Sequence, residues 1–177
     1  MSFTIIIGPM FSGKTTELVR RCKRYDAVGK KVLICNSNKD TRNGLHNVTT
    51  HDGQTLEAKS IDMVTVHWFR TCIKDRYDVI AFDESQFFEN LREVVEYLMK
   101  HDKHVIVAGL SGDSSIGGWD TILGLIPLAT NIVHTKAICV KCHAEAPYTK
   151  RLKPEGERIN IGASEKYMAV CFKCYYT

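Results

Sequence analysis

The chain has 177 residues, of which 44% are hydrophobic and 25% are charged, and its formal net charge is +4. This length suits one ordinary domain with a small appendage and excludes an enzyme built from two large domains. The composition is typical of a soluble globular protein, and no run approaches the roughly 20 apolar residues that span a bilayer. The N-terminal residues lack a basic segment, and their apolar run is too short for a signal peptide. We therefore expect a cytoplasmic protein with no membrane partner.

Strand and helix patterns alternate along the chain up to about residue 135. Residues 3–7 form a short apolar run, and residues 14–28 place apolar side chains at helical spacing. Buried strands are predicted at residues 31–35, 79–82 and 104–108, and an amphipathic helix at residues 91–99. The polar stretch 36–59 is predicted to be a long loop, of the kind that is often functional. Such alternation predicts an α/β fold, with a parallel sheet flanked by helices.

Residues 8–15, GPMFSGKT, fit the pattern G-x-x-x-x-G-K-S/T between the first predicted strand and helix. In such a loop the main-chain N–H groups and the helix N-terminus bind phosphate. Lys14 is then expected to reach the β and γ oxygens of ATP, and Thr15 to bind Mg²⁺. The ATP-binding prediction covers Gly8, Pro9, Met10, Phe11, Ser12, Gly13, Lys14 and Thr15.

A second motif, which is acidic, supports the nucleotide-binding prediction made from the loop at 8–15. Residues 78–84, DVIAFDE, form an apolar strand that ends in two acids, which is the form of a Walker B segment. Asp83 is expected to hold Mg²⁺, and Glu84 to act as a base toward the group that attacks the γ-phosphate. If that group is water, the protein is an ATPase; if it is a substrate hydroxyl, the protein is a kinase.

Two C-x-x-C pairs form a third constellation, made of Cys139, Cys142, Cys171 and Cys174. Because four thiolates can close a tetrahedral site with no open position, we predict a structural zinc ion there. The other three cysteines, Cys22, Cys35 and Cys72, lie in apolar segments and are expected to be small core residues. The change of character near residue 137 predicts two domains, an α/β nucleotide-binding domain at 1–136 and a zinc-binding domain at 137–177.

The basic residues Arg20, Arg21, Lys23 and Arg24 lie together in the first predicted helix. We interpret them as a solvated helix face and expect no stable nucleic-acid binding.

Seven stretches stand in order along the chain: GPMFSGKTTEL, DESQFF at 83–88, VAGL at 107–110, ILGLIPL at 122–128, AICVKC at 137–142, YTKRL at 148–152 and EKYMAVCFKCY at 165–175. Together they resemble the zinc-containing thymidine kinases of the cellular, bacterial and poxvirus type. The resemblance implies a RecA-like P-loop sheet with a small zinc-tethered lasso domain. It also implies transfer of the γ-phosphate of ATP to the 5′-hydroxyl of thymidine, and of deoxyuridine as well, with inhibition by dTTP and a homotetrameric assembly.

The resemblance further implies roles for single residues. Glu84 matches the catalytic base, Asp83 the metal-associated acid, and Asp40 and Arg42 a loop segment near the phosphates, where an arginine could offset developing charge. The implied thymidine pocket comprises Met10, Phe87, Leu110, Trp119, Tyr167 and the lasso run Arg158, Ile159, Asn160, Ile161 and Gly162, whose main chain would hold the base edge.

One segment departs from the family pattern. Where the family has LDGTFQRKPF, this chain has LSGDSSIGGW at 110–119, so Ser114 falls at the position of the aromatic that stacks on thymine. We hypothesise that Trp119 or another side chain compensates, because a stacked ring is worth about 0.5–1.5 kcal/mol beyond its buried area.

Two other function classes stay open at the level of sequence. A RecA-like ATPase that acts on nucleic acid would show hydrolysis stimulated by nucleic acid. A zinc module that binds a nucleic acid or a partner would show no turnover.

Overall fold

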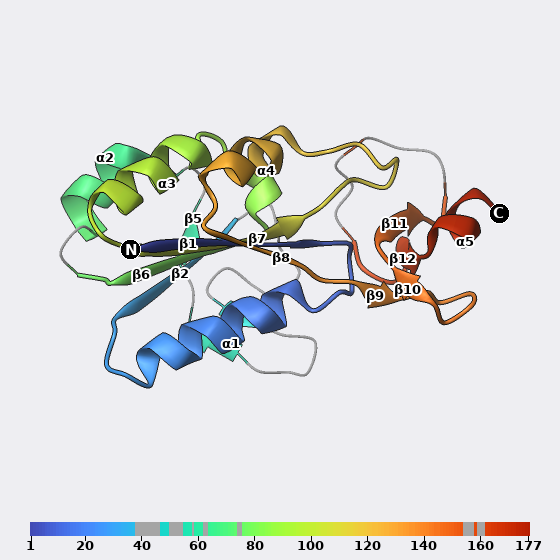
Figure 1. Cartoon of the computed structure of the whole chain (residues 1–177), viewed down its shortest axis with the longest axis horizontal. Helices are drawn as coiled ribbons and strands as arrows, with labels where there is room; N and C mark the ends of the chain where they lie inside the picture. Colours follow the sequence, from blue (N-terminus) through green and yellow to red (C-terminus); the bar gives the residue numbers. More distant parts are fainter. Residues whose placement is uncertain are drawn as a thin grey trace.

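A parallel sheet of six strands forms the centre of the protein in the computed structural model (Figure 1). The structure describes residues 1–37, 47–49, 55–57, 59–61, 64–73, 76–153, 158 and 162–177. The sheet order is β5-β2-β6-β7-β1-β8, and every neighbouring pair is parallel. The strands are β1 (Ser2–Gly8), β2 (Val32–Ser37), β5 (Lys59–Ile61), β6 (Val79–Asp83), β7 (His104–Leu110) and β8 (Asn131–His134).

Helices cover both faces of this sheet, as the α/β prediction requires (Figure 1). On one face lies α1 (Lys14–Asp26), whose buried side chains Leu18, Val19 and Cys22 pack against the central strands. The other face carries α2 (Val66–Trp68), a π-helical turn (Phe69–Ile73), α3 (Leu91–Lys100) and α4 (Asp120–Leu125). A 3₁₀ turn (Ile126–Leu128) continues α4.

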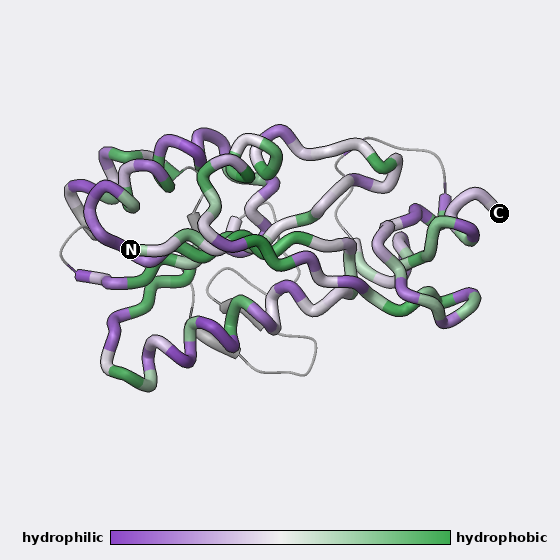
Figure 2. The backbone as a smooth tube through the Cα atoms, in the orientation of Figure 1, coloured by the Kyte–Doolittle hydropathy of each residue, from purple (hydrophilic) through white to green (hydrophobic). Residues whose placement is uncertain are grey.

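The hydrophobic core follows from this layering. The central strands are buried on both faces, and they form the apolar centre of the molecule in Figure 2. The expected helix at 91–99 buries Leu91, Val94, Val95 and Leu98 at helical spacing against the sheet. Cys22 and Cys35 lie in the core as predicted, whereas the side chain of Cys72 lies outside the described part of the structure.

The expected long loop at 36–59 is wrong in part. It contains β3 (Asn47–Thr49) and β4 (Thr55–Glu57), which pair antiparallel, and the beginning of β5. Strand β5 adds to the sheet edge beside β2. Strands of three residues are too short to show an alternating pattern, which is why the sequence did not indicate them.

Residues 137–177 form a small unit at one end of the sheet, which we call the cysteine module (Figure 1). It contains the hairpin β9 (Ala137–Ile138) and β10 (Glu145–Ala146), and a second antiparallel pair, β11 (Tyr148–Arg151) and β12 (Tyr167–Val170). Helix α5 (Phe172–Tyr176) ends the chain. A small core of its own holds the unit together, built from Ala137, Cys139, Ala146, Ala169, Val170 and Cys174. The separate core is compatible with the predicted boundary near residue 137.

None of the helices in the described ranges is long and apolar enough to cross a membrane.

Candidate active site

The loop between β1 and α1 has the geometry of a phosphate-binding loop. Gly13 precedes α1 with φ +78, a left-handed backbone that suits glycine. Gly8 has no room for a side chain, because a Cβ there would collide with Thr135. Phe11 also has a left-handed backbone, with φ +65, which costs a residue with a side chain about 1–2 kcal/mol.

Lys14 is buried in this loop, and its ammonium donates to the carbonyl oxygen of Pro9 at 2.7 Å. The lysine therefore sits on the concave side of the loop, where the β and γ oxygens of a nucleotide would lie. The neighbouring Ser12 hydroxyl donates to Pro9 as well, at 2.8 Å. These bonds close the loop on itself.

Thr15 and Asp83 meet at the carboxyl end of β6. The Thr15 hydroxyl donates to Asp83 Oδ2 at 2.9 Å. Burial, and then the charge of Glu84, raises the pKa of Asp83 to about 7. The Thr15 hydroxyl and the buried Asp83 carboxylate are hard oxygen donors in contact with each other, so this pair fits Mg²⁺.

Glu84 follows directly, with a left-handed backbone at φ +48. Its amide donates to Asp83 Oδ1 at 3.0 Å, and a 3₁₀ turn (Ser85–Phe87) begins after it. The side-chain amide of Gln86 donates to Glu84 Oε2 at 2.6 Å. The other end of Gln86 accepts from the amide of Leu110 at 3.1 Å, so Glu84 is tied through Gln86 to the end of β7.

A single pocket joins these groups to the apolar wall beside them. It encloses about 930 Å³ of space, part of which is open solvent. Lys14, Thr15 and Glu84 line it together with every predicted substrate residue that the structure describes. Those residues are Met10, Phe87, Leu110, Ser114, Trp119, Arg158, Gly162 and Tyr167.

The described part of the structure does not include five of the predicted residues, so their roles stay predictions. They are Asp40, Arg42, Ile159, Asn160 and Ile161. The pocket also contains residues that sequence reasoning missed, namely Gln86, Gly112, Asp113, Thr149 and Ala163. Of these, only Gln86 carried a signal, because it stands two positions after the proposed base in DESQ.

The segment that departs from the family pattern is held by Arg158. Its Nε donates to Asp113 Oδ2 at 2.8 Å, its Nη2 donates to the carbonyl of Gly118 at 2.6 Å, and the guanidinium lies 4.6 Å from the centroid of the Trp119 ring. Trp119 also meets the ring of Phe87 edge to face, with centroids 6.1 Å apart. Ser114 presents no ring to the pocket. Its carbonyl accepts from the Tyr175 hydroxyl of α5 at 2.7 Å.

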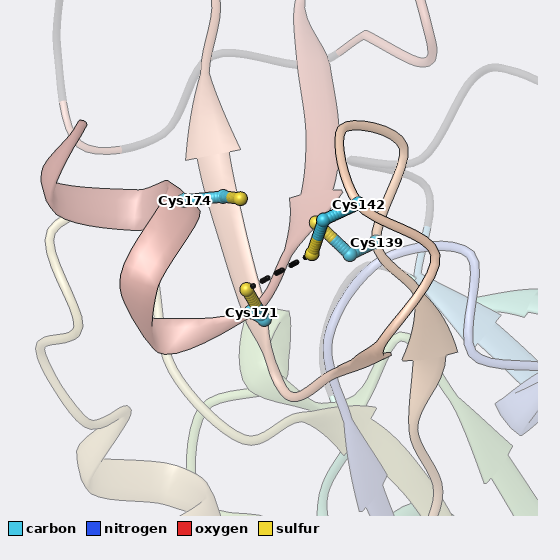
Figure 3. Close-up of side chains that lie close together, drawn as sticks. All are labelled: Cys139, Cys142, Cys171 and Cys174. Carbon is cyan, nitrogen blue, oxygen red and sulfur yellow. Dashed lines mark hydrogen bonds between the residues drawn. The ribbon is translucent and has the colours of Figure 1, made fainter.

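The four paired cysteines converge as predicted (Figure 3). The sulfur atoms of Cys139, Cys142, Cys171 and Cys174 all lie within 4.8 Å of one another, and those of Cys142 and Cys171 are 3.5 Å apart. Around a zinc ion with bonds of about 2.3 Å, tetrahedral sulfur atoms would be about 3.8 Å apart. The cluster therefore fits zinc. The first pair lies on the β9–β10 hairpin, and the second lies at the start of α5 and within it.

The arrangement defines a class: a P-loop phosphotransferase with a mainly apolar pocket beside the phosphate loop. Comparison with known proteins agrees. A model of the thymidine kinase family matches residues 1–175. The chain is 40% identical over 178 residues to the cytosolic thymidine kinase of Gallus gallus, covering 97% of this chain and 75% of that protein. It is 41% identical over 175 residues to the thymidine kinase of Myxoma virus (strain Uriarra), covering 97% of this chain and 94% of the viral protein.

The cytosolic thymidine kinase of Homo sapiens is 40% identical over 174 residues, which cover 97% of this chain and 72% of the human protein. The chain belongs to the thymidine kinase family.

Proposed function

We propose that this protein transfers the γ-phosphate of ATP to the 5′-hydroxyl of thymidine, and of deoxyuridine as well, giving the nucleoside monophosphate and ADP. The observation that carries the proposal is the continuity of one pocket from Lys14 through Glu84 to the apolar wall at Phe87 and Leu110. A nucleoside in the apolar part would direct its hydroxyl toward the phosphate loop. A plain ATPase has no need of that wall.

The chemical step follows from these positions. Glu84 takes the proton of the 5′-hydroxyl as its oxygen bonds to the γ-phosphorus, and the bond from that phosphorus to the β,γ-bridging oxygen breaks. ADP leaves with the electron pair of the broken bond. The loop amides and Lys14 bind the phosphates through this transfer, and Arg42 would balance charge on the γ-phosphoryl group.

Two metal ions have separate parts in this proposal. Thr15 and Asp83 would hold Mg²⁺, which when bound neutralises phosphate charge. Cys139, Cys142, Cys171 and Cys174 would hold zinc, which when bound stabilises the cysteine module without taking part in the reaction. Closing the pocket over the nucleoside would also exclude water from the γ-phosphate.

The substrate contacts belong to the proposal as well. Met10, Phe87, Leu110 and Tyr167 would cover the faces and methyl group of thymine, and the main chain of residues 158–162 would bind its polar edge. We further propose a cytoplasmic homotetramer that dTTP inhibits, with domains at 1–136 and 137–177. The names of the cytosolic relatives support the location.

The alternative of an ATPase that acts on nucleic acid would need a basic surface, and the basic residues of α1 do not favour it. Arg20 and Arg21 both donate to Glu17, at 2.6–2.7 Å for their Nε atoms, so part of the basic run is neutralised within its own helix. No described feature favours a pure binding module.

The test uses ATP labelled at the γ-phosphate, with Mg²⁺ and each deoxynucleoside in turn, and with single-stranded DNA in a separate reaction. The proposal expects labelled dTMP with thymidine, a smaller yield with deoxyuridine, and no stimulation by DNA. Release of labelled phosphate without a labelled nucleotide product would overturn it in favour of the ATPase.

A further inference from the structure

The phosphate loop and the cysteine module share a core through Phe11. This side chain packs against the buried cluster of the module, which includes Cys139 and Cys174 and is bordered by Cys171. The residue that carries the strained left-handed backbone of the loop is thus also the one whose side chain reaches the four-cysteine unit. Strained backbone persists only where the surroundings hold it.

A second contact joins the same two parts. The amide of Met10 donates to the hydroxyl of Thr149 at 2.9 Å, and Thr149 is only 5% exposed. Thr149 lies on β11 opposite Ala169 of β12, and β12 leads directly to Cys171. The orientation of this loop amide therefore depends on a strand pair that ends at a zinc ligand.

A third contact lies where the chain enters the module. Thr135 shares a hydrogen bond of 2.8 Å with Ser12 of the phosphate loop, and it stands four positions before Cys139. Its amide donates to the carbonyl of Ile7 at 2.8 Å, at the end of β1. Contacts from Ser12, Met10 and Phe11 thus reach segments that carry the cysteines.

From these contacts we infer that zinc binding and nucleotide binding are coupled, and that Phe11 and Thr149 are the positioning residues that couple them. A zinc-loaded module holds Phe11 in its core and Thr149 under the Met10 amide, and so holds the loop in its phosphate-binding form. Because coupling between two sites is reciprocal, a bound nucleotide must tighten zinc by the same factor that zinc tightens the nucleotide. The inference rests on the proposed function, since it takes ATP and zinc as the ligands.

The experiment measures zinc affinity of the full chain by equilibrium competition with a zinc-selective chromophoric chelator. It is done with and without a non-hydrolysable ATP analogue and Mg²⁺. For the parent protein we expect the analogue to tighten zinc by about fivefold or more, the lower end of the usual range of coupling. Phe11→Ala should bring this ratio close to one, and Thr149→Val, which keeps the shape of the side chain, should lower it.

The matched control is Phe172→Ala. It removes an aromatic of the same module whose side chain is 62% exposed and lies next to Cys171. This variant should keep the parent ratio. Phe11→Ala removes a packed ring, whereas Thr149→Val removes only a hydroxyl, so the second variant still decides the test if the first does not fold. Circular dichroism and zinc content show which variants are folded.

Three results would overturn the inference. One is a parent protein that binds the analogue but holds zinc equally well with and without it, which leaves the proposed function intact. Another is an unchanged ratio in both Phe11→Ala and Thr149→Val. The third is a parent protein that binds no analogue or no zinc, which overturns the corresponding part of the proposed function as well.

Discussion

The side-chain amide of Gln86 holds the carboxylate of Glu84 at 2.6 Å, while its carbonyl oxygen accepts from the backbone of Leu110. Glu84 lies on a loop after β6, and Leu110 ends β7. The proposed base is therefore positioned from a second strand. Gln86 therefore helps to fix the direction of this carboxylate, which lines the pocket.

Gln86→Leu tests this positioning. We expect kcat to fall about tenfold to a hundredfold, because a displacement near 1 Å of a reacting group has effects of that size. The KM for ATP should change little, since Gln86 does not touch the phosphate loop in the described contacts. Steady-state kinetics with both substrates measure the split. An unchanged kcat would contradict the role, and Tyr97→Phe, which removes a hydroxyl with no partner in the described structure, is the control for nonspecific effects.

Trp119→Ala tests whether this ring compensates for Ser114. Trp119 is 9% exposed and lines the pocket. Its loss should raise the Kd of thymidine about twofold to tenfold, which corresponds to the energy of a ring contact of about 0.5–1.5 kcal/mol. Calorimetric titration with thymidine measures the effect, and Ser115→Ala, at an exposed position of the same segment, is the control. Unchanged thymidine affinity would contradict the hypothesis that Trp119 compensates for Ser114.

Replacement of one of the four clustered cysteines tests the predicted zinc site. Cys142→Ser leaves three thiolates, so we expect less than one zinc ion per chain after dialysis against a mild chelator. Because binding free energy at such a site is folding free energy, the variant should also have a lower Tm. Elemental analysis and thermal unfolding give the two readouts. Val140→Ala, at an exposed position between the first two cysteines, is the control. Full zinc content in the Cys142 variant would contradict the four-thiolate site.

The stability of α1 should depend on pH through Glu17. The hydrogen bond from Arg20, supported by the one from Arg21, lowers the pKa of Glu17 from 4.5 to about 2, against an opposing effect of burial. A carboxyl with a lowered folded pKa stabilises the fold above its unfolded value, and the contribution is lost as the pH falls. Glu17→Gln should therefore cost about 0.5–1 kcal/mol at pH 7, the scale of partly exposed helix pairs.

Urea unfolding at several pH values checks this prediction. The difference in unfolding free energy between the parent and Glu17→Gln should shrink as the pH falls from 4.5 toward 2. A difference that is the same at pH 7 and pH 3 would mean that the charge of Glu17 contributes nothing.

Three parts of the site could be predicted from the sequence, because residues close together in the chain supply the chemistry of each part. The loop at 8–15, the acid pair Asp83 and Glu84, and the four cysteines each have a spacing that their chemistry requires. The strands around them were predictable because they are continuous apolar runs of at least four residues. The family resemblance added the pocket wall, which no local pattern of Phe87 or Tyr167 would have indicated.

Contacts between distant segments could not be predicted in the same way. Thr149 bonds to Met10 across 139 positions, and Tyr175 to Ser114 across 61, and neither residue type signals such a partner. Phe11 is the clearest case. Its side chain packs against the cysteine module, a contact that no pattern in the loop sequence indicates.

The most direct test of the account is a single-turnover comparison of the parent enzyme with Glu84→Gln, together with the thymidine Kd of each. Glu84→Gln keeps the shape of the side chain but cannot take the proton. We predict that thymidine binding stays within about threefold while transfer of phosphate to thymidine slows by about 10²–10⁴. Transfer at the parent rate in Glu84→Gln would contradict the central claim that Glu84 deprotonates the 5′-hydroxyl in this pocket.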